Sequence, residues 1–270
     1  MTEKICAVDL GMPTLLEAVG AEESAALCAE LGLQFVELNM NLPEYADPAH
    51  MDREKLRALR EKYGVYFTLH LDERLDGCDF NPLVRNAYQE TLRRALELAQ
   101  EAEMPIVNLH LNHGVYFTLP GKKTYLYAER REEYLQHIDE MRRIGEEGAD
   151  ENIALCVENT DGFLAQEKKA LDLLMKSKRW GLTLDVGHMH SAGYVDDDVY
   201  IVHSGKLRHM HLHDALLMQA GQCHLPLGEG NLDWRDSLRT AETRHCRAVI
   251  EVKTLSALRD SVKTLREAGK

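Results

Sequence analysis

Histidine and carboxylate side chains lie at the ends of six short apolar stretches of the sequence, where they could bind a divalent cation. These residues are His70, His110, Glu158, Asp185, His211 and Glu251. Each of them alone could be a hydrogen-bonded polar group or a helix cap, so the prediction depends on the whole set. If the stretches converge, unpaired carboxylates among them repel each other and lose hydration, and a cation resolves that conflict.

Four of these side chains indicate which kind of cation to expect. Glu158, Asp185 and Glu251 supply carboxylate oxygens, and His211 supplies one imidazole. This mainly hard ligand set suits Mn²⁺, and it is also compatible with Zn²⁺, Co²⁺ or Mg²⁺. We therefore predict one divalent metal at a site formed by these four residues.

Eight apolar stretches, rich in β-branched residues, must position these side chains. They cover residues 5–10, 35–40, 66–71, 106–111, 153–158, 181–186, 207–212 and 248–252. Segments with helical spacing of apolar residues separate them. The alternation predicts an α/β fold, a (β/α)₈ TIM barrel, as a single domain over residues 1–270. In such barrels the active-site groups sit at the C-terminal ends of the strands, so the six strand ends should meet in one site.

Composition and charge narrow the classes of function. The chain of 270 residues has a formal net charge of −13, which repels a polyanion and disfavours extensive binding to nucleic acid. We expect a soluble cytoplasmic protein without a membrane partner, because no apolar run could span a bilayer and no secretory signal is evident. Six scattered cysteines without a CxxC pair are typical of reduced thiols. The sequence is compatible with a homo-oligomer but does not specify one.

Several short motifs, taken in order, resemble the xylose-isomerase-like barrel superfamily, which holds sugar epimerases, sugar-phosphate isomerases and endonuclease IV. The motifs are FVEL at 35–38, ENT at 158–160, DVGH at 185–188, HLHD at 211–214, GEGNLDW at 228–234 and VIE at 249–251. The resemblance covers essentially the whole chain. It implies a metal-dependent isomerase or epimerase of carbohydrate metabolism, whose substrate is a small sugar or sugar phosphate.

In the ketose-epimerase branch, the resemblance implies that the four residues above hold one metal. Glu158 and Glu251 would also be catalytic, moving a proton next to a metal-polarised carbonyl through an enediolate. The two glutamates could face opposite sides of that planar intermediate, which epimerisation requires. His188 resembles the family histidine that contacts substrate oxygens, with His224 expected nearby.

The same resemblance supports an alternative, an endonuclease IV-like apurinic/apyrimidinic endonuclease with a multinuclear zinc site. Its ligands would match His70, His110, Glu158, Asp185, His188, His211, His224 and Glu251. The ninth position, an aspartate in that family, is Gln222 here, and a neutral amide poorly replaces a bridging carboxylate. The segment 71–76 is acidic where a DNA-facing loop favours basic residues. His70, His110, His188 and His224 are accordingly predicted to bind substrate or an additional metal.

Two further functions are compatible with the same residues. A dehydratase of the same group shares the opening proton removal, and a barrel could also bind a ligand without turnover. His209 and His213 flank His211 and could support it or line the mouth. The remaining candidates are interpreted as surface or loop histidines: His113, His190, His203 and His245.

Overall fold

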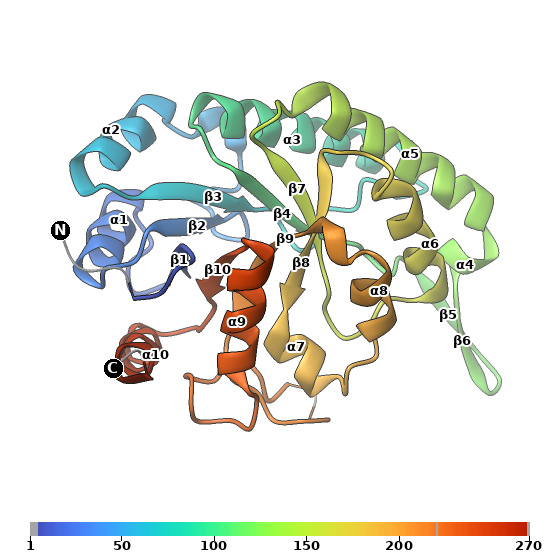
Figure 1. The fold of residues 1–270 in the computed structure, drawn as a ribbon. Helices are drawn as coiled ribbons and strands as arrows, with labels where there is room; N and C mark the ends of the chain where they lie inside the picture. Colours follow the sequence, from blue (N-terminus) through green and yellow to red (C-terminus); the bar gives the residue numbers. More distant parts are fainter. Residues whose placement is uncertain (1–4, 220, 269–270) are drawn as a thin grey trace.

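Eight parallel strands close into a barrel in the computed structural model, which describes residues 5–219 and 221–268 (Figure 1). The strands are β1 (Leu10–Pro13), β2 (Phe35–Asn39), β3 (Tyr66–His70), β4 (Ile106–His110), β7 (Ala154–Glu158), β8 (Trp180–Asp185), β9 (Leu207–Leu212) and β10 (Arg247–Ile250). Their order around the barrel is β1-β10-β9-β8-β7-β4-β3-β2, and every neighbouring pair is parallel. The predicted (β/α)₈ fold is confirmed.

Helices surround this barrel, and each long one buries an apolar face against the strands (Figure 1). The longer helices are α1 (Ala21–Glu30), α2 (Arg53–Tyr63), α3 (Pro82–Glu101), α5 (Arg131–Gly148), α6 (Ala165–Leu174), α9 (Trp234–Arg244) and α10 (Leu255–Ala268). Three short ones are α4 (Leu126–Glu129), α7 (Val186–Ser191) and α8 (Asp197–Val202). Helix α7 follows β8 without an intervening loop, so it starts at the mouth of the barrel.

The interior of the barrel contains a layer of polar side chains among its apolar ones. Glu37, Thr68, Asn108, Thr183 and His209 are each at most 2% exposed. The ring of His209 on β9 contacts Glu37 on β2, although β1 and β10 lie between those strands in the barrel order. That contact must therefore cross the interior, and the layer forms a floor beneath the strand ends.

Two features differ from the sequence prediction. The first strand was predicted at 5–10, but pairing begins at Leu10, which lies opposite Ala248, while Gly11 lies opposite Phe35. The carbonyl of Asp9 still accepts a hydrogen bond from the backbone N–H of Ala248 at 3.0 Å, so residues 5–9 lead into the strand and the paired strand itself starts at Leu10. In addition, a hairpin of β5 (Tyr116–Leu119) and β6 (Lys122–Tyr125) follows β4 and projects beyond the ring of helices (Figure 1).

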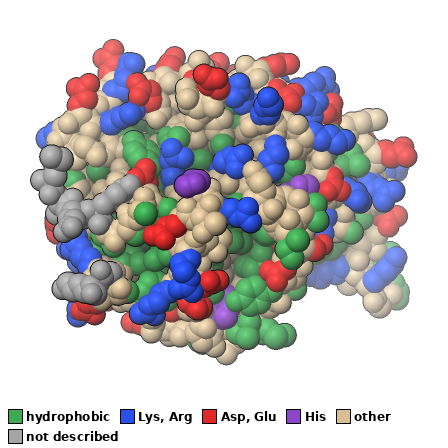
Figure 2. Space-filling model, viewed as in Figure 1, with side chains coloured by type: hydrophobic (Ala, Val, Ile, Leu, Met, Phe, Trp, Pro, Cys, Tyr) green, Lys and Arg blue, Asp and Glu red, His purple; other side chains and the backbone are tan. Residues whose placement is uncertain are grey.

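The charged side chains on the surface and the composition of the helices indicate which classes of partner to expect. Basic and acidic side chains are interspersed on the face shown in Figure 2, and among the described residues no continuous basic stripe crosses that face. Within residues 5–219 and 221–268, no helix combines the length and apolar character needed to cross a membrane.

Candidate metal centre

Three carboxylates surround one histidine nitrogen at the mouth of the barrel. Nδ1 of His211 lies 3.0 Å from Oε1 of Glu158, 3.1 Å from Oε2 of Glu251 and 3.8 Å from Oδ2 of Asp185. The side chains of His211 and Asp185 are fully buried, and those of Glu158 and Glu251 are 2% and 13% exposed. We call these four residues the central cluster. It joins the ends of β7, β8 and β9 to the residue that follows β10.

In the central cluster, the buried carboxylates stay ionised only because positively charged groups lie next to them. Burial alone would raise the pKa of Glu158 and Glu251, but His211 and other histidines outweigh it and hold both pKa values well below their usual range. Burial likewise would lower the pKa of His211, and Glu158 and Glu251 raise it well above its usual value. A divalent cation can replace that proton as the positive charge.

The orientation of His211 is fixed by Glu37, a residue that the sequence analysis did not assign to the site. Nε2 of His211 lies 2.8 Å from Oε1 of Glu37, so this N–H donates to Glu37 and Nδ1 faces the carboxylates, where a metal can take the place of its proton. Oε2 of Glu37 accepts from the Thr68 hydroxyl and from Nε2 of His209, both at 3.0 Å. We call Glu37, Thr68, His209 and His211 the Glu37 cluster. A carboxylate behind a histidine is the usual arrangement for orienting a metal ligand.

On one side of the central cluster, two more histidines approach Glu158. Nε2 of His70 and Nε2 of His110 lie 3.3 and 3.2 Å from its Oε2. Nδ1 of His70 donates to the carbonyl of Leu71 at 2.8 Å, which leaves Nε2 directed at Glu158, where it carries a proton or can bind a metal. Oε2 of Glu158 also accepts from the amide of Asn108.

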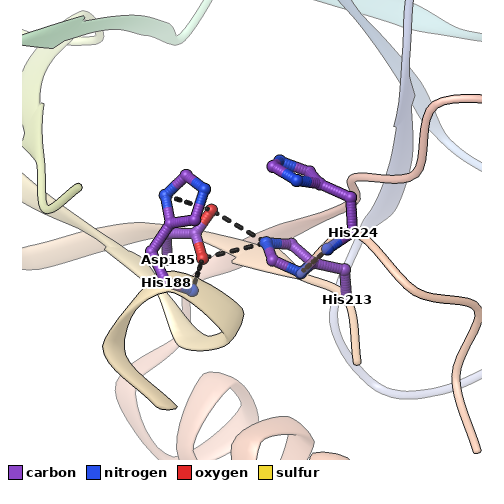
Figure 3. Close-up of side chains that lie close together, drawn as sticks. All are labelled: Asp185, His188, His213 and His224. Atoms are coloured by element: carbon purple, nitrogen blue, oxygen red, sulfur yellow. Dashed lines mark hydrogen bonds and ion pairs between the residues drawn. The ribbon is translucent and has the colours of Figure 1, made fainter. Parts of the chain in front are cut away.

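On the opposite side, a group of residues gathers around Asp185 (Figure 3). Ligand atoms of Asp185, His188, His213 and His224 all lie within 4.8 Å of one another. Asp185 caps α7 by accepting from the backbone N–H of His188 at 2.7 Å, and Nδ1 of His188 is 3.4 Å from its Oδ2. A methyl group on Gly187 would fall 2.0 Å from the His213 ring, so only glycine lets this ring pack against α7.

The thiol of Cys223 lies beside this group, next to His224, and was not among the residues predicted from the sequence. Its Sγ is 3.2 Å from Nδ1 of His224. Hydrogen bonds from His188 and then His224 lower the pKa of Cys223 to about 6. Gln222, the neutral residue at the family's aspartate position, is exposed. The adjacency of Cys223 to His224 was the only signal for it in the sequence.

The other predicted residues divide between buried and exposed positions. His213 is fully buried and lines the site, and His209 lies one layer deeper. The prediction of His190 as a surface residue was wrong. It is 5% exposed because its ring is held between Tyr194, at 2.7 Å, and Asn231, at 2.6 Å, which join α7 to the loop before α9.

Comparisons with known proteins match most of the chain. The sequence pattern of a family described as "Xylose isomerase-like TIM barrel" matches residues 25–268. An uncharacterized protein of Methanocaldococcus jannaschii is 27% identical over 217 residues, which cover 77% of this chain and 71% of that protein.

Solved structures share the fold at lower sequence identity. A D-tagatose 3-epimerase-like protein superposes with a TM-score of 0.75 at 23% identity and covers 96% of both chains. An L-ribulose 3-epimerase gives 0.73 at 16% identity and covers 97% of this chain and 94% of its own. The IOLI protein, described with a bound zinc atom, gives 0.71 at 15% identity, with 97% and 96% covered.

Proposed function

The chain belongs to the xylose isomerase-like TIM barrel family, and on that premise we propose that it is a divalent-metal-dependent isomerase or epimerase of a sugar or sugar phosphate. The observation that carries the proposal is the central cluster, in which three carboxylates face one imidazole nitrogen. Epimerases among the solved structures that share this fold support the choice of substrate class.

The donor set fits a divalent metal. Oε2 of Glu251 is buried and has no hydrogen-bond partner among the described residues, although Nδ1 of His211 is 3.1 Å away. Three carboxylates and one neutral imidazole suit Mn²⁺, and they also accept Zn²⁺, Co²⁺ or Mg²⁺. Glu158, Asp185, His211 and Glu251 would hold the ion, which when bound polarises a substrate carbonyl and acidifies the adjacent C–H bond.

The two glutamates perform the proton transfers. Glu158 ends β7 and Glu251 follows β10, so they approach the centre from strands that β8 and β9 separate. One carboxylate removes the proton from the carbon next to the carbonyl, and the other returns a proton on the opposite face of the planar intermediate. His211 and then His224 hold the pKa of Glu251 well below its usual range, and Lys253, whose Nζ lies 3.0 Å from Oε1 of Glu251, adds a smaller contribution.

Exchange of a substrate proton with solvent tests this proposal. We expect metal-loaded protein to incorporate one deuterium from D₂O into a ketose or ketose phosphate beside its carbonyl, as read by mass spectrometry across a panel. Glu158→Gln and Glu251→Gln should each slow incorporation by about 10²- to 10⁴-fold. Glu147→Gln, an exposed glutamate on α5, is the matched control and should retain the wild-type rate.

The outcomes separate the neighbouring activities. Appearance of an enone absorbance instead of exchange would identify a dehydratase. Ligand affinity without exchange in any panel member would contradict the proposed reaction and indicate a binding protein.

One observation favours a second candidate, an apurinic/apyrimidinic endonuclease with several zinc ions. The pair His70 and His110 shares Glu158 with the central cluster, and the pair His188 and His224 lies beside Asp185. Exposed Gln222 and the net charge of −13 oppose it. Cleavage of a duplex carrying one abasic site, by zinc-loaded protein that leaves every ketose unchanged, would support this candidate over the isomerase.

A further inference from the structure

We propose that Tyr200 on α8 is a positioning residue for Asp185 and acts on it through the side-chain amide of Asn159. Helix α8 lies outside the ring of strands (Figure 1), so an outer helix would help to place a metal ligand at the mouth of the barrel. The inference rests on the proposed function only in assuming that the central cluster binds a metal, and it does not require sugar turnover.

The backbone pairing between β7 and β8 ends before it reaches Asp185. The last paired residues are Glu158 and Thr183, so Asp185 lies two positions beyond the paired part of β8 on that side. The side chain of Asn159 takes over at this point. Its Oδ1 accepts from the backbone N–H of Asp185 at 2.9 Å, and its Nδ2 donates to the carbonyl of Asp185 at 3.0 Å. One buried amide therefore holds both main-chain polar groups of Asp185, as a neighbouring strand would.

The hydroxyl of Tyr200 fixes the amide of Asn159 in turn. It lies 2.6 Å from Oδ1 of Asn159 and 2.6 Å from the carbonyl oxygen of Thr183. Both of these oxygens can only accept, so the phenol donates and the amide oxygen receives a second hydrogen bond. Because Asn159 and Thr183 are fully buried, loss of the phenol hydroxyl would leave each acceptor with one donor fewer.

A second contact joins α8 to the loop that begins at Asn159. Both carboxylate oxygens of buried Asp196 accept from the backbone N–H of Phe163, at 3.0 and 3.1 Å. Asp196 directly precedes α8, and Phe163 lies in the loop between β7 and α6. The helix and this loop are therefore fixed to each other at two points, which keeps Tyr200 in place to hold Asn159.

Asp185 needs such support because its carboxylate lies among other buried acids. Its Oδ2 is 3.8 Å from Nδ1 of His211, the longest of the three carboxylate distances in the central cluster. The charge of Glu251 repels it, and a carboxylate that was free to move would turn away. His213 holds the side chain of Asp185 and Asn159 holds its main chain, so the ligand is in place before an ion arrives.

Metal titration of Tyr200→Phe tests the inference. The change keeps the ring and removes only the hydroxyl, so we expect the affinity of metal-free protein for Mn²⁺ to fall about tenfold, as for other groups that orient metal ligands. Tyr45→Phe is the matched control, because the Tyr45 hydroxyl also donates to a backbone carbonyl, that of Val19, from the loop between β2 and α2. This control should lower Tm by a similar amount and leave Mn²⁺ affinity unchanged.

Two further measurements separate positioning from general stability. At saturating Mn²⁺, the zero-field splitting in the electron paramagnetic resonance spectrum should change in Tyr200→Phe and should match the wild type in Tyr45→Phe. A double-mutant cycle with Asn159→Ser tests the path. If Tyr200 acts through Asn159, removal of its hydroxyl should weaken Mn²⁺ binding less than about twofold in the Asn159→Ser background. If Asn159→Ser does not fold, the comparison of Tyr200→Phe with Tyr45→Phe decides alone.

Three results would overturn the inference: wild-type Mn²⁺ affinity and spectrum in Tyr200→Phe, equal losses of affinity in Tyr200→Phe and Tyr45→Phe, or additive losses in the cycle. These results differ from failure of the proposed reaction. Wild type that exchanges no ketose proton, but loses Mn²⁺ affinity on Tyr200→Phe, would uphold the inference and refute the isomerase. Normal exchange with unchanged Mn²⁺ affinity in Tyr200→Phe would do the reverse, and wild type that binds no metal would refute both.

Discussion

The Glu37 cluster and the central cluster both combine carboxylates with histidine and are both largely buried, but their hydrogen bonds differ. In the Glu37 cluster, the carboxylate oxygens accept from Thr68, His209 and His211. In the central cluster, one oxygen from each of three carboxylates faces the same ring nitrogen of His211, and Oε2 of Glu251 has no hydrogen-bond partner among the described residues. A buried acid whose oxygens all accept from donors is structural support, whereas three buried acids that each direct an oxygen at the same nitrogen form a place for a cation.

His211 links the two clusters because its two nitrogens have opposite tasks. Nε2 donates to Glu37, and this fixes Nδ1 toward Glu158 and Glu251, where it carries a proton or binds a metal. The comparison therefore predicts that loss of Glu251, which faces Nδ1 of His211, weakens metal binding more than loss of Glu37, which faces Nε2.

The largest effect is expected from the central cluster. Glu251→Gln replaces a charged ligand by a neutral amide of similar shape, so we expect the metal at this cluster to bind at least about 100-fold more weakly. Elemental analysis of chelator-free protein measures the metal content per chain, and titration into metal-free protein measures the affinity. Lys253→Met is the control, because it removes the neighbouring charge but leaves the carboxylate. Wild-type metal content in Glu251→Gln would contradict the assignment of Glu251 as a ligand.

A smaller effect on metal binding is expected from the Glu37 cluster. Glu37→Gln keeps the shape but weakens the bond that orients His211, so metal affinity should fall by about 10- to 100-fold without loss of the site. Calorimetric titration with Mn²⁺ and Zn²⁺ measures it. Complete loss of metal from folded Glu37→Gln would contradict the view that the Glu37 cluster only supports His211 while the central cluster binds the metal.

The sequence alone predicted the barrel and the meeting of the four central-cluster side chains at its mouth, because both follow from local pattern, while their binding of a metal stays a prediction. Each central ligand ends an apolar strand, and the barrel brings strand ends together. The part that could not be predicted depends on distances across the barrel. Glu37 lies 172 residues before its partner His209 in the sequence, and only the closed ring places them in contact. Cys223 lies beside His224 in a loop whose shape depends on two features. Asp214 accepts a hydrogen bond from the backbone N–H of Gly228, and His224 has a left-handed backbone conformation with a φ of 59°.

The pH dependence of stability should distinguish His70 and His224, which face the mouth of the barrel, from His209 in the Glu37 cluster. Burial would lower the pKa of His70, but Glu158 raises it to about 9, and His224 rises similarly to about 9 beside Cys223 and Glu251. These folded-state pKa values exceed the unfolded value near 6.5, so the stability they contribute is complete below about pH 6.5 and is lost as the pH rises toward 9. Burial lowers the pKa of His209, which stays neutral throughout this window and adds no slope.

Thermal denaturation checks this prediction. Metal-free protein should lose several degrees of Tm between pH 6.5 and 9, whereas the increase in Tm produced by Zn²⁺ should grow over the same range, because a metal competes with protons for the imidazoles. Equal slopes with and without Zn²⁺ would mean that His70 and His224 do not face the metal sites.

The smallest effect on metal affinity is expected from Thr68→Val, which should separate an effect on stability from an effect on metal binding. The change preserves the shape of the side chain but removes the hydroxyl that donates to Glu37. Because a buried charged acceptor loses a hydrogen bond, the free energy of unfolding should fall by about 1.5–3 kcal/mol. His209 and His211 still hold Glu37, and metal affinity should change only a few-fold. Thr68→Ser, which keeps the hydroxyl, should recover most of the stability. Chemical denaturation and metal titration measured on the same preparations separate the two effects. A large loss of metal affinity in Thr68→Val would mean that the position of His211 depends on the whole floor of the barrel, and that the two clusters act as one unit.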